Sequence, residues 1–381
     1  MSSEGRASGK HLLVLLLLCL SVWGWTYGLW DLWGADETRY TQVSRELLTR
    51  NNWLVLTVFD RPYDQKPPLS FWIYALMLKL AGGRISVWHL RLAPILFAMA
   101  TLGMTYFLGR RVCGEKVGFL ASLMVFTSTV FISEATEVKM DIMFTAWITL
   151  SLTLWLCRTK GEPLGLLRAF GVWAALAAAF FTKGPLAILI VISSIATEAW
   201  SEHTWKVFRD ARTVWGLLGL GLLIAGWLHA QASAAGSEFV ATQVRGETLN
   251  RLLHGAHDEP VWFYFNSLYQ KIFTPWVLLW IPLFLRLRSG QMRFPKQLLP
   301  FAGWFAIPFL ILIIARGKRP PYMLPLLPAM AIVTAWLLDR LIEERRFAPK
   351  LNRALCILFP ILGVALLIAV IILQRFTQLH V

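Results

Sequence analysis

Residues that can do acid–base or ionic chemistry are concentrated in a few short segments of this chain. One segment reads Asp-Glu-Thr-Arg-Tyr and begins at Asp36, and another reads Tyr-Asp-Gln-Lys-Pro-Pro and begins at Tyr63. A few carboxylates among several cations suit an anionic substrate, because the cations attract it. The candidates of this kind are Asp36, Glu37, Arg39, Tyr40, Tyr63, Lys66, Asp141, Lys183, Glu247, Arg251, His257, Lys318 and Tyr322.

Taken singly, these residues also have ordinary structural explanations. Asp36 precedes a helical apolar stripe that starts at Tyr40, so it could serve only as the N-cap of a helix. Arg39 could be a surface charge near lipid headgroups. Lys66 could be a lysine that snorkels beside an interfacial helix. These alternatives stay open as long as each residue is considered alone.

The composition predicts that membrane-spanning helices position these residues. Of the 381 residues, 57% are hydrophobic and 15% are charged, whereas about 25% are charged in a typical soluble domain. These values exclude a soluble globular enzyme, a disordered chain and a nucleic-acid-binding domain, and we expect no nucleic-acid partner. The net charge of +15 is therefore interpreted as membrane topology together with anionic substrates.

The apolar stretches predict an all-α, polytopic membrane protein with about eleven spans of ~20 residues each. The first stretch, residues 11–33, resembles a signal peptide, but no small-residue cleavage site stands out, so we expect a retained first helix. The four cysteines share no metal-like spacing. The expected spans begin near residues 11, 88, 117, 141, 168, 184, 213, 274, 298, 321 and 354.

The orientation of the whole chain depends on the shorter apolar run 66–82. If this run crosses the membrane, the loop 110–116 lies outside and every later loop inverts. If it lies along the outer surface, the short basic loops fall inside, as the positive-inside rule requires. We therefore predict that 66–82 is an outer interfacial helix. The segments then expected in the cytoplasm are 1–10, 110–116, 158–168, 202–212, 286–296 and 339–353.

This topology leaves two long external segments, 31–88 and 232–269, in a single domain that covers residues 1–381. The candidate residues lie in these segments or in short external turns near the ends of spans, where a polar group must face water or a protein cavity. Because Val381 follows soon after the final apolar run, we expect no further soluble domain.

Taken together and in order, the polar motifs resemble one family. The segments that begin at Asp36 and Tyr63 are similar to those of GT-C glycosyltransferases of the aminoarabinose transferase and protein O-mannosyltransferase type. Further matches are Val-Lys-Met-Asp ending at Asp141, Phe-Thr-Lys-Gly-Pro ending at Pro185, and Arg-Gly-Lys-Arg-Pro-Pro-Tyr starting at Arg316. The resemblance covers nearly the whole chain. It implies an integral membrane enzyme that uses a polyprenyl-phosphate sugar.

The resemblance also implies roles by position. Asp36 matches the family's catalytic aspartate, a general base for a hydroxyl acceptor. Lys66 matches the lysine that contacts the donor phosphate, whose developing charge cations must offset. Asp141 matches a second acid at the start of a later span. Residues that match the lining of the donor pocket or cavity are Arg39, Tyr40, Tyr63, Lys183, Arg251, Lys318 and Tyr322, with Glu37 and Glu247 as further candidates.

Two positions depart from the aminoarabinose transferases. An acid and a histidine that resemble a divalent-metal pair are replaced here by Gln65 and Thr248. Neutral oxygens bind a divalent ion weakly, so we expect no structural zinc there and no cofactor. His254 and His257 remain as alternative ligands.

The expected function is transfer of a sugar from a polyprenyl-phosphate donor to a lipid, glycan or protein acceptor. The reaction would take place on the outer, periplasmic or exterior, face of the cytoplasmic (inner) membrane. The alternative is a transporter or flippase of lipid-linked sugars. A transporter should carry polar groups near the midplane and pseudo-symmetric halves, whereas here the charges gather at one face. The ordered acidic and basic motifs argue against a non-catalytic scaffold.

Overall fold

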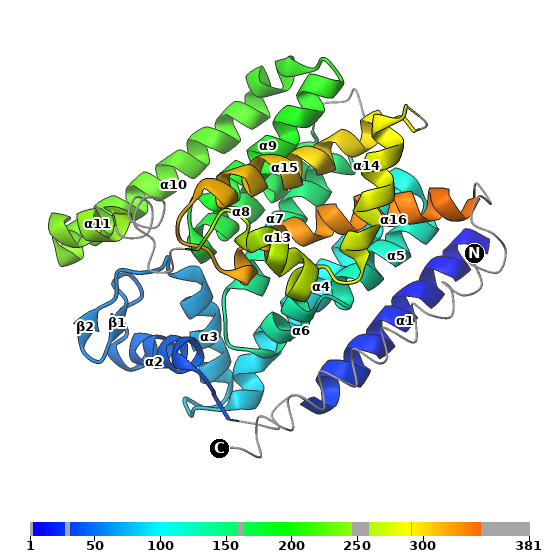
Figure 1. Ribbon diagram of the computed structural model, residues 1–381. Coiled ribbons are helices and arrows are strands. Elements are labelled where there is room, and N and C mark those ends of the chain that lie inside the picture. Colours follow the sequence, from blue (N-terminus) through cyan, green and yellow to red (C-terminus); the bar gives the residue numbers. More distant parts are fainter. Residues whose placement is uncertain (1–2, 27–30, 159–163, 246–258, 291, 344–381) are drawn as a thin grey trace.

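The computed structural model describes residues 3–26, 31–158, 164–245, 259–290 and 292–343 (Figure 1). Within these ranges the chain is almost entirely helical, as the composition predicts. The one sheet in the described part is a hairpin of two short strands, β1 (Thr57–Val58) and β2 (Arg61–Pro62).

Five helical stretches are long and apolar enough to cross a membrane. A sixth crossing is obtained if α5 (Glu115–Phe126) and α6 (Thr129–Thr136), which meet at a bend of 67°, form one broken span. The structure thus has several spans, but the expected number of eleven is not confirmed. The five stretches are α4 (Val87–Cys113), α8 (Leu166–Lys183), α10 (Ala211–Ala235), Lys296–Ile314 with η5 (Lys296–Leu298) and α15 (Leu299–Ile314), and Pro320–Ile342 with η6 (Pro320–Leu326) and most of α16 (Leu327–Glu343).

Other expected spans are shorter or broken. Helix α1 (Ser3–Thr26) has an apolar part of only Gly9–Gly24, and α7 (Asp141–Leu156) and α9 (Leu186–Ser201) have 16 residues each. The run expected to begin near 354 lies outside the described residues. Where a span was expected near 274, the structure has α13 (Phe263–Ser267), η3 (Leu268–Ile272), η4 (Trp276–Leu279) and α14 (Trp280–Arg288).

Helix α7 lies at the centre of the bundle. It packs against α4 and α8, while α15 packs on α9 and α16 packs on α5 (Figure 1). Helices α4 and α5 approach so closely that a Cβ atom on Gly118 would lie 2.5 Å from the carbonyl oxygen of Tyr106. Helix α7 also packs against η6, so the bundle positions the first residues of α7 and η6, which include candidate residues.

Short elements cover one end of the bundle. Helix α2 (Ala35–Arg50), the hairpin and α3 (Leu69–Leu80) lie together there (Figure 1). Tyr40 and Val43 of α2 share a small apolar core with Tyr63 and Phe71. Helix α3 has 12 residues, which is about 18 Å at 1.5 Å per residue and shorter than a bilayer core of about 30 Å. This length agrees with the prediction that 66–82 lies along the surface, which stays a prediction.

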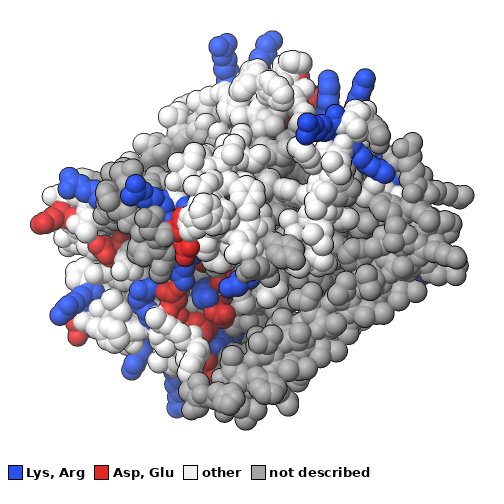
Figure 2. Space-filling view, viewed as in Figure 1, with Lys and Arg blue, Asp and Glu red and all other residues white. Residues whose placement is uncertain are grey.

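The two ends of the described surface differ in the charges that they carry. Figure 2 shows acids and bases intermixed beside α2, β1, β2 and α3, whereas the opposite end, beyond α9 and α14, shows mainly Lys and Arg. Basic residues there belong to η1 (Trp205–Arg209) and α14. Such a division is what the predicted orientation requires.

Cysteine labelling tests this orientation. In a variant without native cysteines, Lys116→Cys places one thiol on an exposed position just after the α4–α5 turn. We expect it to react only with reagents that reach the cytoplasm, because the positive-inside rule places this basic turn inside. Labelling of Lys116→Cys by an impermeant reagent in intact cells would contradict the orientation.

Candidate active site

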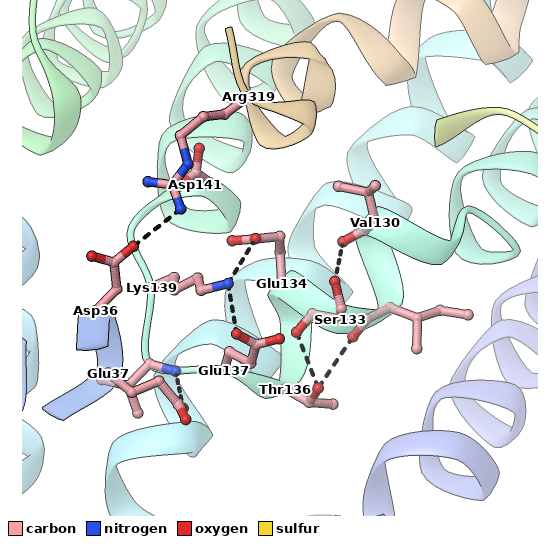
Figure 3. A network of polar contacts seen from close by, with 12 residues as sticks. Asp36, Glu37, Val130, Ser133, Glu134, Thr136, Glu137, Lys139, Asp141 and Arg319 are labelled. Carbon is pink, nitrogen blue, oxygen red and sulfur yellow. Dashed lines mark hydrogen bonds and ion pairs between the residues drawn. The ribbon is translucent and has the colours of Figure 1, made fainter. Parts of the chain in front are cut away.

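The first turn of α2 presents two adjacent acids in different directions. Successive residues of a helix are about 100° apart, so Asp36 and Glu37 face different neighbours (Figure 3). The N-cap position belongs to Gly34, and no side chain caps the helix. The explanation of Asp36 as an N-cap is therefore wrong, and its carboxylate is free for other partners.

Asp36 pairs with two arginines. One is Arg39, one turn along the same helix, and the other is Arg319, whose Nη2 lies 3.3 Å from Asp36 Oδ2 (Figure 3). The Asp36 side chain is 20% exposed, so it can be reached from solvent. Burial, the largest single effect, would lower the pKa of Arg319, but the combined effects of Asp36, Tyr322 and Asp141 raise this pKa, with Asp36 contributing most among the three.

The second acid, Asp141, begins α7 and forms an ion pair with Lys183 at the end of α8. The Nζ atom of Lys183 also lies 4.6 Å from the ring centroid of Tyr322, within the range of a cation–π interaction. The structure thus brings together Asp141, Lys183 and Tyr322, which come from three distant sequence motifs. The segment that carries Arg319 and Tyr322 reaches both acids, because Arg319 pairs with Asp36 and Tyr322 lies beside the Lys183 that pairs with Asp141, so the two acids belong to one site.

Two tyrosines and an arginine line the same region. The rings of Tyr40 and Tyr63 pack edge-on against Phe71 at centroid distances of 5.5 and 5.6 Å, and the guanidinium of Arg39 lies 5.5 Å from the Tyr40 ring centroid. Burial raises the pKa of Tyr40 well above its usual value, and the nearby Tyr63, Asp36 and Asp141 raise it further. Tyr40 therefore keeps its proton at neutral pH and can donate a hydrogen bond.

Two expected phosphate-binding lysines are both buried. Lys66, in the segment between β2 and α3, is 6% exposed, and Lys318 is 4% exposed. Lys318 Nζ donates a hydrogen bond to the carbonyl oxygen of Glu259 at 2.7 Å. The neighbouring Arg319, which the sequence reasoning did not single out, contacts Asp36 instead.

Glu37 has a different environment from Asp36. It is 2% exposed, and its carboxylate accepts hydrogen bonds from the backbone N–H of Val138 at 2.7 Å and of Trp33 at 2.9 Å. Arg91 Nη2 lies 3.5 Å from its Oε2. Glu37 therefore joins α2 to α4 and to the turn before α7, and its oxygens face protein groups.

Part of the expected site lies outside the described residues, namely Glu247, Arg251, Thr248, His254 and His257. In the described part of the chain, no three or more His, Cys, Asp or Glu residues are grouped so that they could hold a metal ion.

Comparison with known proteins shows what this chain is similar to in sequence and in fold. Residues 65–228 match the family model of dolichyl-phosphate-mannose-protein mannosyltransferase. The structure of ArnT from Cupriavidus metallidurans bound to undecaprenyl phosphate superposes with a TM-score of 0.75 at 21% identity, over 89% of this chain and 61% of that chain. The chain is similar to GT-C glycosyltransferases of the ArnT type.

Curated relatives carry the same resemblance. The undecaprenyl phosphate-alpha-4-amino-4-deoxy-L-arabinose arabinosyl transferase 2 of Proteus mirabilis is 28% identical over 350 residues, which is 90% of this chain and 62% of the relative. Transferase 1 of Pseudomonas fluorescens strain Pf-5 is 29% identical over 362 residues, again 90% and 62%. The chain thus spans about three fifths of the length of these relatives. The archaeal oligosaccharyltransferase AglB of Archaeoglobus fulgidus shares the fold more distantly, with a TM-score of 0.58 at 11% identity over 92% of this chain and 52% of that chain.

Proposed function

We propose that this chain transfers a sugar from a polyprenyl-phosphate donor to a hydroxyl acceptor at the outer face of the cytoplasmic membrane. The observation that carries the proposal is that the segment with Arg319 and Tyr322 meets both acids, Asp36 through Arg319 and Asp141 through Lys183, at the end of the bundle where acids and bases mix. The names of the relatives favour 4-amino-4-deoxy-L-arabinose as the sugar. The family resemblance supports a polyprenyl-phosphate donor and favours a lipid or glycan acceptor, of which lipid A is our first choice.

In the proposed reaction, the acceptor oxygen forms a bond to the anomeric carbon while the bond from that carbon to the phosphate oxygen breaks. Asp36 takes the proton of the acceptor hydroxyl as general base. Direct displacement inverts the configuration at the anomeric carbon. The polyprenyl phosphate leaves with an additional negative charge, which fixed cations stabilise.

The cations have separate roles in this proposal. Lys66, with Arg251 and Lys318, was expected to face the leaving phosphate. The side chain of Arg319 is 46% exposed, and a planar guanidinium can bind phosphate bidentately while it stays charged. We therefore add Arg319 to the phosphate-binding residues. Lys318 then contributes less than Arg319 to the stabilisation of the leaving phosphate. Asp141 holds Lys183 beside Tyr322.

A comparison of two neighbouring substitutions tests this assignment. We expect Arg319→Gln to lower kcat about 100-fold, because loss of one preorganised donor to a developing anion typically costs about 10²–10³. Lys318→Gln, whose contact is to a backbone carbonyl, should mainly lower the melting temperature. Kinetics and thermal unfolding of both purified variants provide the measurement. A larger loss of kcat in the Lys318 variant would reverse the assignment.

The function itself is tested with purified protein, undecaprenyl phosphate-4-amino-4-deoxy-L-arabinose and lipid A in detergent. Mass spectrometry should detect modified lipid A and free undecaprenyl phosphate. A transporter or flippase, for which the comparisons offer no support, would form neither product in detergent. If several polyprenyl-phosphate pentoses and hexoses all remained intact, the proposal would be wrong.

A further inference from the structure

The turn before α7 is attached to α2 and α3, and also to α6. This turn, Glu137 to Met140, is called the bracket here. Its Val138 N–H donates to Glu37 of α2 at 2.7 Å, and its Lys139 carbonyl oxygen accepts a hydrogen bond from the hydroxyl of Tyr74 in α3 at 2.6 Å. Its Met140, 1% exposed, packs in the small apolar core beneath α2 and α3. The bracket is therefore held to both α2 and α3.

An ion-pair cluster joins the bracket to α6. Lys139 Nζ lies 3.2 Å from Glu134 Oε1 and 2.6 Å from Glu137 Oε2 (Figure 3). Burial alone would lower the pKa of Lys139, but Glu134 and Glu137 outweigh burial and raise it, so that the lysine stays charged. Glu134 is 2% exposed, and its Oε2 has no hydrogen-bond partner among the described residues.

The bracket lies between the two acids of the site. Asp141 follows it directly in the chain, and Asp36 precedes Glu37, which binds the bracket through Val138. A shift of the bracket would therefore change the separation of Asp36 and Asp141. Helix α6 belongs to the packed bundle, whereas α2 and α3 are short elements at its end. The ion pair of Glu134 with Lys139 therefore ties the bracket to the bundle, which the contacts with α2 and α3 do not do.

We propose that Glu134 and Lys139 are positioning residues whose ion pair holds the bracket, and with it Asp141, at a fixed place relative to Asp36. The proposal rests on the proposed function for its kinetic part. Neither residue needs to touch the substrate. Loss of Lys139 would leave the carboxylate of Glu134, 2% exposed, without its charged partner, which is strongly unfavourable. Loss of Glu134 would leave Lys139 paired with Glu137 alone, and either change would release the bracket from Glu134 of α6.

The kinetic test uses Glu134→Gln and Lys139→Met, with Lys139→Arg as the conservative variant. A misplacement of about 1 Å can cost about 100-fold in rate. We expect kcat to fall about 10- to 100-fold in the first two variants, with the KM for undecaprenyl phosphate-4-amino-4-deoxy-L-arabinose within about twofold of wild type. Lys139→Arg should retain most of the wild-type kcat, because its guanidinium can bridge the carboxylates of Glu134 and Glu137 as the lysine does.

A background without Asp141 separates positioning from general damage. If Glu134 acts through Asp141, adding Glu134→Gln to Asp141→Asn should reduce the residual rate by less than about twofold, since residues that act as a unit are not additive. Glu198→Gln serves as the matched control. It removes another buried carboxylate, bound by Trp155 and Arg158 at the opposite end of α7 from Asp141, and should lower stability while leaving kcat unchanged.

Hydrogen exchange provides a readout that needs no substrate. Amide exchange measured by mass spectrometry should become faster in peptides covering 137–141 of Glu134→Gln, and should not change there in Glu198→Gln. Unchanged exchange in Glu134→Gln, wild-type kcat in Glu134→Gln, or fully multiplicative losses with Asp141→Asn would each overturn the proposal. If the wild-type protein transferred no sugar, the proposed function would fail, and the exchange experiment would still decide the role of the pair.

Discussion

Asp36→Asn should lower sugar transfer by about 10²–10⁴-fold, the usual loss when a general base is removed. The amide keeps the shape of the side chain and an oxygen that can still accept a hydrogen bond from Arg319, 3.3 Å away. It cannot take a proton from the acceptor hydroxyl. Donor binding should therefore survive while kcat falls. Turnover and undecaprenyl phosphate binding, measured on the purified variant, test both expectations.

Another acid of the segment 31–88 provides the control. Asp60 pairs with Arg50, its side chain is 82% exposed, and it lies at a positive φ of 64° that asparagine tolerates well. Asp60→Asn should leave turnover unchanged. Near-wild-type turnover of Asp36→Asn would refute the assignment of the base. Glu37 would then be the remaining acid of the motif, although at 2% exposure it would first have to exchange its backbone partners.

The sequence predicted the kind of fold better than the number of spans. Long apolar runs such as 87–113 appear as single helices, because hydropathy reports directly on burial in lipid. The break between α5 and α6 lies inside one apolar run, where the Ser128 hydroxyl accepts a hydrogen bond from the N–H of Phe131 and caps α6. Because hydropathy is averaged over a window of residues, a single capping serine does not alter the average, and the bend cannot be predicted from it.

The residues of the site were predictable by region, but their partners were not. The motifs placed Asp36, Asp141 and the basic segment from Arg316 in external turns, and the structure brings these turns together. Arg319 is 283 positions from Asp36, so only tertiary packing can pair them. Arg319 also has an extended backbone, with φ −144° and ψ 142°, and successive side chains of an extended chain point to opposite sides. The sequence alone could not tell whether Lys318 or Arg319 faces the site.

Lys66→Ala should damage transfer more than removal of divalent metal does. The resemblance places Lys66 at the donor phosphate, and the Pro-Pro that follows it restricts where it points. Loss of one fixed cation at a developing anion typically costs about 10²–10³ in kcat. Chelation, in contrast, should leave most activity intact, because Gln65 and Thr248 stand where an anionic and an imidazole ligand would be expected. An ion held only by phosphate and neutral oxygens is bound weakly.

The experiment compares initial rates of wild-type protein before and after EDTA treatment with those of Lys66→Ala and Lys66→Arg. The arginine variant separates charge from shape. It should keep more activity than alanine if charge is what matters, and less than wild type, because a guanidinium does not fit a site buried to 6% exposure as a lysine does. Asp141 is the residue through which transfer could depend on metal after all. It is a second carboxylate of the same site as Asp36, and it pairs with Lys183. If EDTA abolished transfer and added Mn²⁺, Mg²⁺ or Zn²⁺ restored it, the two acids would bind a metal together, and Lys183 would have to leave Asp141 for that to happen.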